Sequence, residues 1–383
     1  MSPLTIHGDN VLILPTLPSS FVQTCITSPP YFGLRDYGVE PTNWPEITYV
    51  PMAGINPLTV PPMVCCLGQE SNPGSYTAHL VHVFREVRRV LRDDGTLWLN
   101  LGDSYAGSGK CSNPDGSAHK SKLVGKQGEN KGMLYGINKP QKANKIGLRA
   151  KDLMGIPWRA AFALQADGWV LRQDIIWSKP NPMPESVNDR CTKSHEYIFM
   201  FSKNQHYYYD SEAIKTPPSP SLIKQVNEGY QGSSTKDFDA CGVQNASSTK
   251  SRIIGQCRKK IDKQRGHSRR HAGFNERWDL MTTNEQRSLG ANKKSVWNVA
   301  TKPYRGAHFA TFPSELIEPC VLAGSGVNDW VMDIFGGSGT SAEVALKHGR
   351  KSLIIELNPT YVELSKSRHI NLQRDLLTCA RAI

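Results

Sequence analysis

The chain has 383 residues and a formal net charge of +12, a length that suits roughly two or three structural units or one large domain with insertions. No apolar run approaches the roughly 18 to 20 residues needed to span a bilayer, and the N-terminus lacks the charged start and apolar stretch of a secretory signal. We therefore expect a cytoplasmic protein that does not associate with membranes.

The nine cysteines are scattered along the chain without the paired spacing of a disulfide framework, so we expect reduced thiols. The best set of metal-ligating residue types is Cys241, Cys257, His267 and His271. Their spacing is loose, and the sequence contains no C-x-x-C pair. We therefore predict a polar loop in this region and no metal site.

The first 36 residues predict two strands, near 6–9 and 21–27, each followed by a loop. The second strand must end at Pro29-Pro30, because consecutive prolines cannot continue a central strand.

The tetrapeptide Ser28-Pro29-Pro30-Tyr31 follows this strand. It is either a rigid turn with an aromatic lid or a site for an amino group. The amino group of cytosine or adenine is a poor nucleophile, because its lone pair is delocalised into the ring. Acceptors that hold both amino hydrogens would turn the lone pair toward a methyl donor, while an aromatic ring stacks on the base. Ser28 and the Pro29 carbonyl are the candidate acceptors, Pro30 helps to fix that carbonyl, and Tyr31 is the candidate stacking surface.

The next region alternates between order and a long polar segment. Apolar residues at helical spacing predict an amphipathic helix over 76–91, followed by a turn at 92–95 and a strand over 96–101. Residues 104–150 are rich in Gly, Ser, Asn and Lys, a composition that predicts a mobile loop.

Order resumes with a predicted helix around 157–167 and strands at 170–177 and 196–202, which a proline-rich stretch separates. The segment from 211 to about 300 is polar, weakly periodic and typical of an insertion. Between residues 250 and 294 it contains 13 basic residues against four acidic ones. Such a surplus is either a solvated face or a nucleic-acid contact.

The C-terminal part predicts a helix near 313–324, a buried strand over 330–335, a glycine-rich turn, a helix over 340–348 and a strand over 352–356. Strands that alternate with helices, several of them continuously apolar, indicate an α/β fold. Its sheet should be mostly parallel with helices on both faces.

The glycine-rich turn at 333–340, between the strand and the helix, is a candidate ligand site. Glycines let the backbone approach a ligand closely, and the helix after them presents free N–H groups. Glu356 ends the next strand, where a carboxylate can accept hydrogen bonds from ribose hydroxyls. These features predict an adenosine-containing ligand. The absence of a Lys after Gly339 excludes the phosphate loop of an NTPase, and the dinucleotide pattern fails at its last glycine.

The tetrapeptide Ser28-Pro29-Pro30-Tyr31 resembles motif IV of the DNA amino-methyltransferases, and the glycine-rich turn at 333–340 resembles their motif I. Their order is the permuted one of the beta class, in which the catalytic motif precedes the cofactor motif. Gly8-Asp9 resembles the family's motif III, residues 308–313 resemble motif X, and residues 174–181 are similar to the strand and loop beside the target base. The conjunction of motifs in one order is far more specific than any single motif.

The resemblance covers about residues 4–210 and 302–370 and implies a Rossmann-like methyltransferase fold with S-adenosylmethionine as cofactor. The cofactor-binding residues that it implies are Asp9, His308, Ala310, Phe312, Pro313, Asp333, Phe335, Gly336, Gly337, Ser338, Gly339, Thr340, Glu356 and Asn358.

Three parts of the chain follow from this resemblance. Residues 1–210 form the catalytic part, 211–300 the target-recognition insert, and 301–383 the cofactor-binding part. We expect duplex DNA to be the substrate, because the basic surplus of the insert can neutralise phosphates. The expected DNA-contacting residues are Trp177, Lys179, Asn181, Lys259, Lys260, Arg269 and Arg270.

Several alternatives remain open from the sequence. Serine at position 28, where adenine-specific relatives commonly have aspartate, favours cytosine N4 over adenine N6. Pro319-Cys320 has the dipeptide of a cytosine-C5 enzyme but lies in an apolar helical pattern, which favours a buried thiol. A catalytically inactive DNA-binding protein and an RNA substrate are further alternatives. A cognate restriction endonuclease is a possible partner, and the chain is a monomer or a homodimer.

Overall fold

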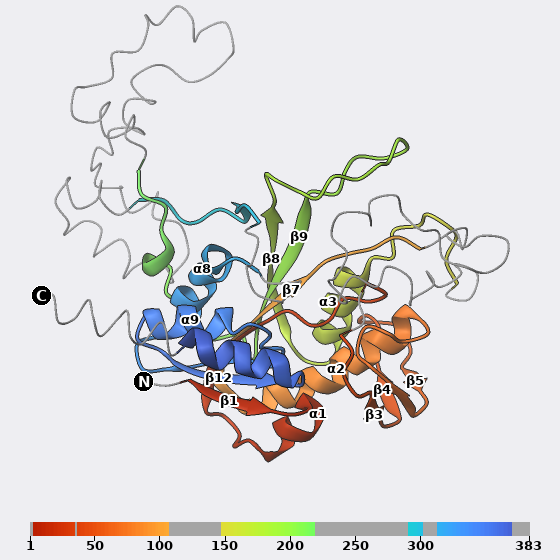
Figure 1. The fold of residues 1–383 in the computed structure, drawn as a ribbon, viewed down its shortest axis with the longest axis horizontal. Helices are drawn as coiled ribbons and strands as arrows, with labels where there is room; N and C mark the ends of the chain where they lie inside the picture. The colour runs from red at the N-terminus through yellow and green to blue at the C-terminus, as the bar shows by residue number, and fades with distance from the viewer. Residues whose placement is uncertain (1–2, 35–36, 107–146, 219–289, 302–311, 370–383) are drawn as a thin grey trace, which may run out of the picture. The chain divides into compact units, whose positions relative to one another are not determined.

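The computed structural model describes residues 3–34, 37–106, 147–218, 290–301 and 312–369 (Figure 1). The chain divides into two compact units, Met1–Asp210 with Ser295–Ile383, and Ser211–Lys294. The described part of the second unit contains the short helix η4 (Glu212–Ile214) and an antiparallel bridge between Thr216 and Ala291. All other helices and strands among the described residues belong to the first unit.

An eight-stranded sheet forms the centre of the first unit. Its strands, in spatial order, are β1 (Leu4–His7), β12 (Lys351–Glu356), β11 (Trp330–Asp333), β2 (Val22–Thr27), β7 (Leu91–Leu101), β9 (His195–Ser202), β8 (Val170–Ser178) and β10 (Val296–Asn298). Every neighbouring pair is parallel except the two pairs that involve β9. The predicted α/β fold with a mostly parallel sheet is therefore confirmed.

Helices cover both faces of this sheet (Figure 1). They are α1 (Asn10–Ile13), η1 (Leu14–Thr16), α2 (Pro73–Val90), α3 (Ile156–Ala166), α8 (Ser314–Gly324) and α9 (Thr340–Lys347), and residues 359–369 are also helical. α8 packs on β2 and β7, and α9 packs on β11 and β12. α2 and α3 pack together over the opposite face. No helix among the described residues combines the length and apolarity needed to cross a membrane.

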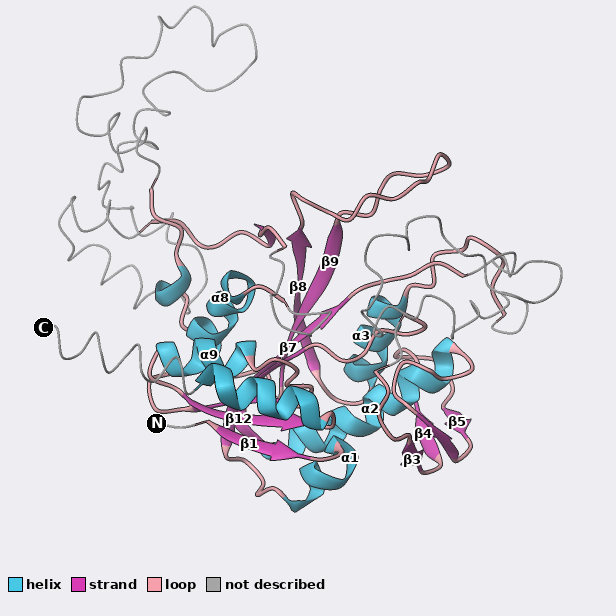
Figure 2. Cartoon of the chain, viewed as in Figure 1, coloured by secondary structure: helices cyan, strands magenta, loops and turns pink. Residues whose placement is uncertain are grey.

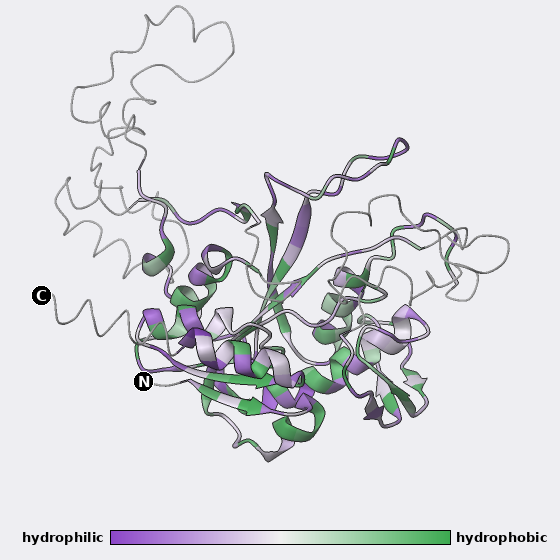
Figure 3. Cartoon of the chain, viewed as in Figure 1, coloured by the Kyte–Doolittle hydropathy of each residue, from purple (hydrophilic) through white to green (hydrophobic). Residues whose placement is uncertain are grey.

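Alternating side chains of the strands explain why both faces are covered. In β7, Leu97 and Leu99 contribute to the core with α2, whereas Trp98 between them faces Gly324 of α8. All three side chains are fully or almost fully buried. The apolar centre of β12 can be followed in Figure 3. A strand that is buried on both faces has the continuous apolar pattern from which the C-terminal strands were predicted.

Two small antiparallel sheets lie between β2 and α2 in the chain (Figure 2). They are β3 (Thr42–Trp44) paired with β6 (Met63–Cys65), and β4 (Ile47–Tyr49) paired with β5 (Leu58–Val60). The sequence did not predict them, because strands of three residues are too short to show a period of two. β10 was missed for the same reason.

The predicted turn at 92–95 is wrong as a break between two elements. These residues lie inside β7, where β2 pairs through Val22 with Leu91 and again through Thr24 with Thr96. Four residues of β7 thus stand opposite one residue of β2, and the strand bulges there. Gly95 suits the bulge, because a Cβ atom would lie 2.9 Å from the Arg92 carbonyl oxygen.

Candidate active site

A cavity lies where four neighbouring parallel strands end. Gly8 and Asp9 follow β1, Ser28 and Pro30 follow β2, Phe335 and Gly337 follow β11, and Glu356 ends β12; all of them line the cavity. Its empty space, which includes open solvent at the mouth, is about 920 Å³. Ligands of open α/β sheets bind at this carboxyl edge.

The turn after β11 is organised by the buried side chain of Asp333. Its Oδ1 accepts hydrogen bonds from the Thr27 hydroxyl at 2.7 Å and from the backbone N–H of Phe335 at 3.1 Å, and its Oδ2 accepts one from the Ser341 hydroxyl at 2.7 Å. Burial raises the pKa of this carboxyl group, although the three hydrogen bonds act in the opposite direction. Asp333 therefore joins the turn to β2 and α9 rather than lining the cavity.

Glycine at position 336 is required by the packing of this turn. A Cβ atom there would lie 1.9 Å from Cγ2 of Ile354 in the neighbouring strand. Gly339 has φ of 76°, which favours glycine. The close approach brings the backbone of the turn down onto β12.

The end of the turn, from Ser338 to Thr340, does not line the cavity. Arg368 donates hydrogen bonds to the hydroxyl oxygens of Ser338 at 3.2 Å and Thr340 at 3.0 Å. The carbonyl of Gly339 is bonded to the ring of His369. These residues therefore connect the turn to the helical residues 359–369, and their part in the site is to shape the turn.

Glu356 points its carboxylate back at the same turn. Oε2 accepts a hydrogen bond from the backbone N–H of Gly337 at 2.7 Å, and Oε1 accepts one from the N–H of Asn358 at 2.8 Å. Burial raises the pKa of Glu356, while these backbone bonds lower it. Each oxygen has a second lone pair for a hydroxyl donor in the cavity, and Asn358 also lines the cavity.

Asp9 has a comparable double role beside Glu356, because it follows β1, whose His7 pairs with Glu356. Its Oδ1 caps α1 by accepting the N–H of Val11 at 2.9 Å. Its Oδ2 accepts the Thr42 hydroxyl at 2.6 Å. The carboxylate therefore ties β1 to the small sheet β3–β6, whose Thr42 and Trp44 form part of the cavity wall.

The four residues after β2 differ in what their groups contact. The hydroxyl of Tyr76 in α2 donates a hydrogen bond to the carbonyl of Pro30 at 2.8 Å, so this carbonyl is bound within the protein. Ser28 and Pro30 line the cavity, and Pro29 is buried. The ring of Tyr31 turns toward β7 and β9, where its hydroxyl donates to Glu196 at 2.8 Å and Asn100 at 3.1 Å.

Comparison with known proteins shows the family of this chain. The family model described as DNA methylase matches residues 22–367. The chain is 37% identical over 363 residues to the type II methyltransferase M.Cfr9I of Citrobacter freundii, covering 94% of this chain and 86% of the relative. It is 38% identical over 363 residues to M.SmaI of Serratia marcescens, covering 95% and 89% respectively. The chain belongs to the DNA methylase family.

A solved relative of this methylase shares its fold. The structure titled PvuII DNA methyltransferase (cytosine-N4-specific) aligns with a TM-score of 0.50 at 15% identity, covering 99% of this chain and 93% of that chain. The resemblance inferred from the sequence motifs is thus confirmed, as is the methyltransferase fold.

Three predicted DNA-contacting residues of the methylase lie along β8 and its loop, outside the set that lines the cavity. The ammonium group of Lys179 lies 4.3 Å from the ring centroid of Trp177 and is bonded to Glu196. The indole N–H of Trp177 donates to the Val299 carbonyl at 2.8 Å. Asn181 exchanges hydrogen bonds with the backbone of Thr301. Trp177 and Asn181 thus fix local structure, whereas Lys179 is linked through Glu196 to Tyr31.

Other predicted site residues are placed elsewhere or fall outside the described residues. Phe312 and Pro313 lie directly before α8, where Pro313 is the N-cap, and neither lines the cavity. The residues outside the described ranges are His308, Ala310, Lys259, Lys260, Arg269, Arg270, Cys241, Cys257, His267 and His271. Cys320 is fully buried in α8, as expected for a structural thiol.

Sequence reasoning missed one whole wall of the cavity, which comes from the segment between β2 and α2. Residues of this wall are Tyr37, Val39, Glu40, Thr42, Trp44, Cys66, Leu67 and Gln69. Tyr361 of the helical residues 359–369 was missed as well. Tyr37 and Trp44 are aromatic residues of the kind that can pack against a nucleoside. They are far from the glycine-rich turn in the sequence, and nothing in the sequence places them over the sheet edge.

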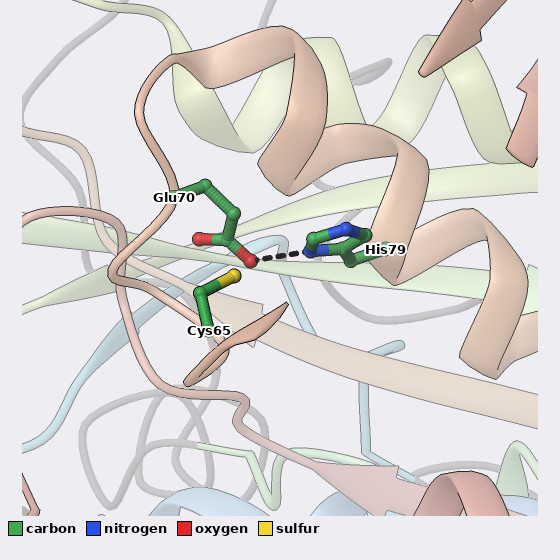
Figure 4. Close-up of side chains that lie close together, drawn as sticks. All are labelled: Cys65, Glu70 and His79. Atoms are coloured by element: carbon green, nitrogen blue, oxygen red, sulfur yellow. Dashed lines mark hydrogen bonds and ion pairs between the residues drawn. The ribbon is translucent and has the colours of Figure 1, made fainter. Parts of the chain in front are cut away.

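A buried carboxylate–imidazole pair supports that wall (Figure 4). Glu70 and His79, both fully buried, are joined by a hydrogen bond of 2.8 Å from Nδ1 to Oε1, and the Cys65 thiol lies beside them. The ring of His79 stacks on Trp44 with centroids 4.0 Å apart. Glu70 also accepts the N–H of Gly68 at 2.8 Å. Burial raises the pKa of Cys65 to about 12. The indole N–H of Trp44 donates to the Cys65 carbonyl at 3.0 Å, so this cluster holds Trp44 in the wall.

Proposed function

We propose that this methylase transfers a methyl group from S-adenosylmethionine to the exocyclic N4 amino group of a cytosine extruded from duplex DNA. The observation that carries this proposal is the shared cavity. Ser28 and Pro30 of the tetrapeptide line the same cavity as Gly337 of the turn after β11 and Glu356 at the end of β12. A methyl donor and an acceptor amino group would therefore meet in one place.

The residues at the sheet edge fit S-adenosylmethionine. Both oxygens of Glu356 retain acceptor capacity for ribose hydroxyls, and Phe335 and Tyr361 offer apolar surface in the cavity. When bound, the cofactor supplies an electrophilic methyl group. The protein binds the nucleoside through Glu356, shapes the turn through Asp333 and Gly336, and closes the opposite wall with Trp44.

The tetrapeptide supplies acceptors for the amino group. Because Tyr76 already bonds the Pro30 carbonyl, we assign the second acceptor to the carbonyl of Pro29 and the first to the hydroxyl of Ser28. Two acceptors that hold the amino hydrogens localise the lone pair on nitrogen and direct it at the methyl group. Tyr31 provides a surface on which the extruded base stacks.

Serine rather than aspartate at position 28 supports cytosine N4 as the methylated atom, with adenine N6 as the second candidate. We further propose that the segment 211–300 recognises the target sequence. Modification of that sequence would protect it from a cognate restriction endonuclease, in keeping with the type II relatives.

Mass analysis of nucleosides tests the reaction directly. Duplex DNA and single-stranded RNA are incubated separately with the enzyme and isotopically labelled S-adenosylmethionine, then digested. N4-methylcytosine from duplex DNA alone is the expected product. N6-methyladenine would overturn the base assignment, 5-methylcytosine would overturn amino-methylation, and binding of DNA without incorporation would mean that the protein is a DNA binder.

Two variants connect this product to the tetrapeptide. Ser28→Ala should abolish most turnover, because it removes one acceptor of the amino group. Tyr31→Ala should lower turnover sharply, because base stacking of this kind contributes roughly 1 to 3 kcal/mol. Both should retain cofactor affinity, since the β11 turn and Glu356 are untouched. Ser367→Ala, which removes an exposed hydroxyl that donates to the Leu364 carbonyl, is the matched control. Unchanged methylation by Tyr31→Ala would remove this ring from the site.

A further inference from the structure

Glu196, the second residue of β9, connects two residues that the sequence placed in different motifs. Its Oε2 accepts the hydroxyl of Tyr31 at 2.8 Å, and its Oε1 is bonded to the ammonium group of Lys179. The side chains of Glu196 and Lys179 are only 16% and 18% exposed. A paired carboxylate that is this shielded from water keeps its geometry better than a surface pair does.

Asn100 of β7 contacts the same hydroxyl, which is also hydrogen-bonded to the Ser28 side chain. Its Oδ1 accepts the Tyr31 hydroxyl at 3.1 Å, and its Nδ2 donates to the carbonyl of Tyr197 at 3.0 Å. Burial raises the pKa of Tyr31 well above its ordinary value, so the phenol remains protonated and acts as the donor. The hydroxyl is therefore anchored between two neighbouring strands.

Backbone packing limits the other motions of the ring. At Gly102, the residue after β7, a Cβ atom would lie 2.6 Å from Cε2 of Tyr31. The ring thus rests against the backbone on one side while Glu196 and Asn100 hold its far end. A change of the χ1 angle, which would swing the whole ring, requires the bond to Glu196 to break.

We propose that Glu196 is a positioning residue that fixes the ring of Tyr31 for the extruded base, an inference that rests on the proposed function. Lys179 balances the charge of Glu196, since an unpaired carboxylate with so little exposure would be costly. Glu196 does not line the cofactor cavity. Its effect should therefore appear in turnover and not in cofactor affinity.

A double-mutant cycle between Tyr31 and Glu196 tests this assignment in the full-length enzyme. Wild-type methylation of duplex DNA is measured first, and its failure would overturn the proposed function together with this inference. If the wild type is active, kcat, the KM for DNA and the Kd for S-adenosylmethionine are compared for Glu196→Ala, Glu196→Gln, Tyr31→Phe and the double variant Tyr31→Phe/Glu196→Ala. Glu363→Ala, an exposed carboxylate paired with Lys366, is the control.

Glu196→Ala should lower kcat roughly tenfold or more and leave cofactor Kd unchanged, because only the anchor of Tyr31 is lost. Glu196→Gln retains an acceptor for the hydroxyl and should recover most of kcat. The double variant should be no slower than the slower single variant. Three results would overturn a role of Glu196 through Tyr31. They are a double variant whose loss of kcat is the sum of the two single losses on a logarithmic scale, a Glu196→Gln variant as slow as Glu196→Ala, and wild-type kcat in Glu196→Ala.

A fluorescence readout keeps the test decisive if Glu196→Ala fails to fold. A duplex with 2-aminopurine at the methylated position reports stacking of the extruded base by quenching. Tyr31→Phe and Glu196→Gln should both bind this duplex, and only Tyr31→Phe, which loses both hydroxyl anchors, should show brighter emission than the wild type. Equal emission from all three proteins would contradict the proposal.

Discussion

The carboxylate of Glu356 accepts the backbone N–H of Gly337 at 2.7 Å. This bond joins the end of β12 to the turn after β11, so the acidic residue and the glycine turn form one unit rather than two separate contacts. The turn needs both this bond and the missing side chain at Gly336, where a Cβ atom would meet Ile354. Changes at Glu356 therefore act on the ligand and on the shape of the turn together.

Replacement of Glu356 should weaken S-adenosylmethionine binding more than it slows the chemical step. Glu356→Ala removes the acceptor of the ribose hydroxyls and leaves the N–H groups of Gly337 and Asn358 without their partner. A hydrogen bond to a charged group contributes roughly 1.5 to 3 kcal/mol, so we expect Kd to rise about 10- to 150-fold. Titration calorimetry measures this directly, with Glu363→Ala as the exposed control. Equal affinity of the Glu356→Ala variant and the wild type would refute the assignment.

Cofactor affinity should also fall as the pH is lowered toward the raised pKa of Glu356. Burial lifts this pKa above the ordinary 4.5 of a glutamate, and hydroxyl donors from a bound ribose favour the ionised form, which lowers the pKa in the complex. The complex then holds fewer protons than the free protein, and by linkage affinity rises with pH across this range. Calorimetry in two buffers of different ionisation enthalpy should detect proton release on binding.

Glu356→Gln isolates this carboxyl group from other titrating groups, including the buried Asp333. The variant should bind more weakly than the wild type and show a flatter dependence of affinity on pH. An identical slope in both proteins would mean that another group titrates.

Much of this edge of the sheet could be predicted from the sequence. The runs at 330–335 and 352–356 are apolar because both of their faces are covered, and parallel strands bring their carboxyl ends together. Glu356, the glycine turn and Ser28 can therefore be placed at one edge from the sequence alone. Their roles still rest on the proposed function.

The partners of Tyr31 could not be predicted in the same way. Glu196 and Asn100 approach each other only because β7 and β9 pair with Asn100 opposite Ile198 and Leu101 opposite Tyr197. A slip of one residue would turn each side chain to the opposite face, and strand register is not encoded in local pattern. The wall around Trp44 depends likewise on tertiary packing of strands only three residues long.

A single methyl group at position 102 should disturb the position of the Tyr31 ring, on which the extruded base is proposed to stack. Gly102 has no positive φ, so alanine suits its backbone, but the added Cβ would lie 2.6 Å from Cε2 of Tyr31. We expect Gly102→Ala to displace the ring and lower kcat roughly tenfold, with a loss of about 1 to 3 kcal/mol of stability from overpacking. Cofactor Kd should not change. Steady-state kinetics and thermal unfolding give both values, and Gly102→Ala with wild-type kcat would show that the ring position is unimportant.

The basic segment should act on DNA affinity and leave the cofactor site alone. Neutralising Lys259, Lys260, Arg269 and Arg270 together should weaken binding to every duplex and flatten its salt dependence, because each lost phosphate contact removes about one unit from the slope of log affinity against log salt. Cofactor affinity should stay unchanged, since Asp333 and Glu356 belong to the other compact unit. The control removes equal charge from that unit, at Arg85, Arg92, Lys347 and Lys366, whose side chains are 42% to 60% exposed. DNA affinity across a salt series decides between these outcomes. Equal losses of DNA affinity in both fourfold variants would indicate a general effect of net charge. Wild-type affinity and slope in the variant of the basic segment would leave that segment without a role in DNA binding.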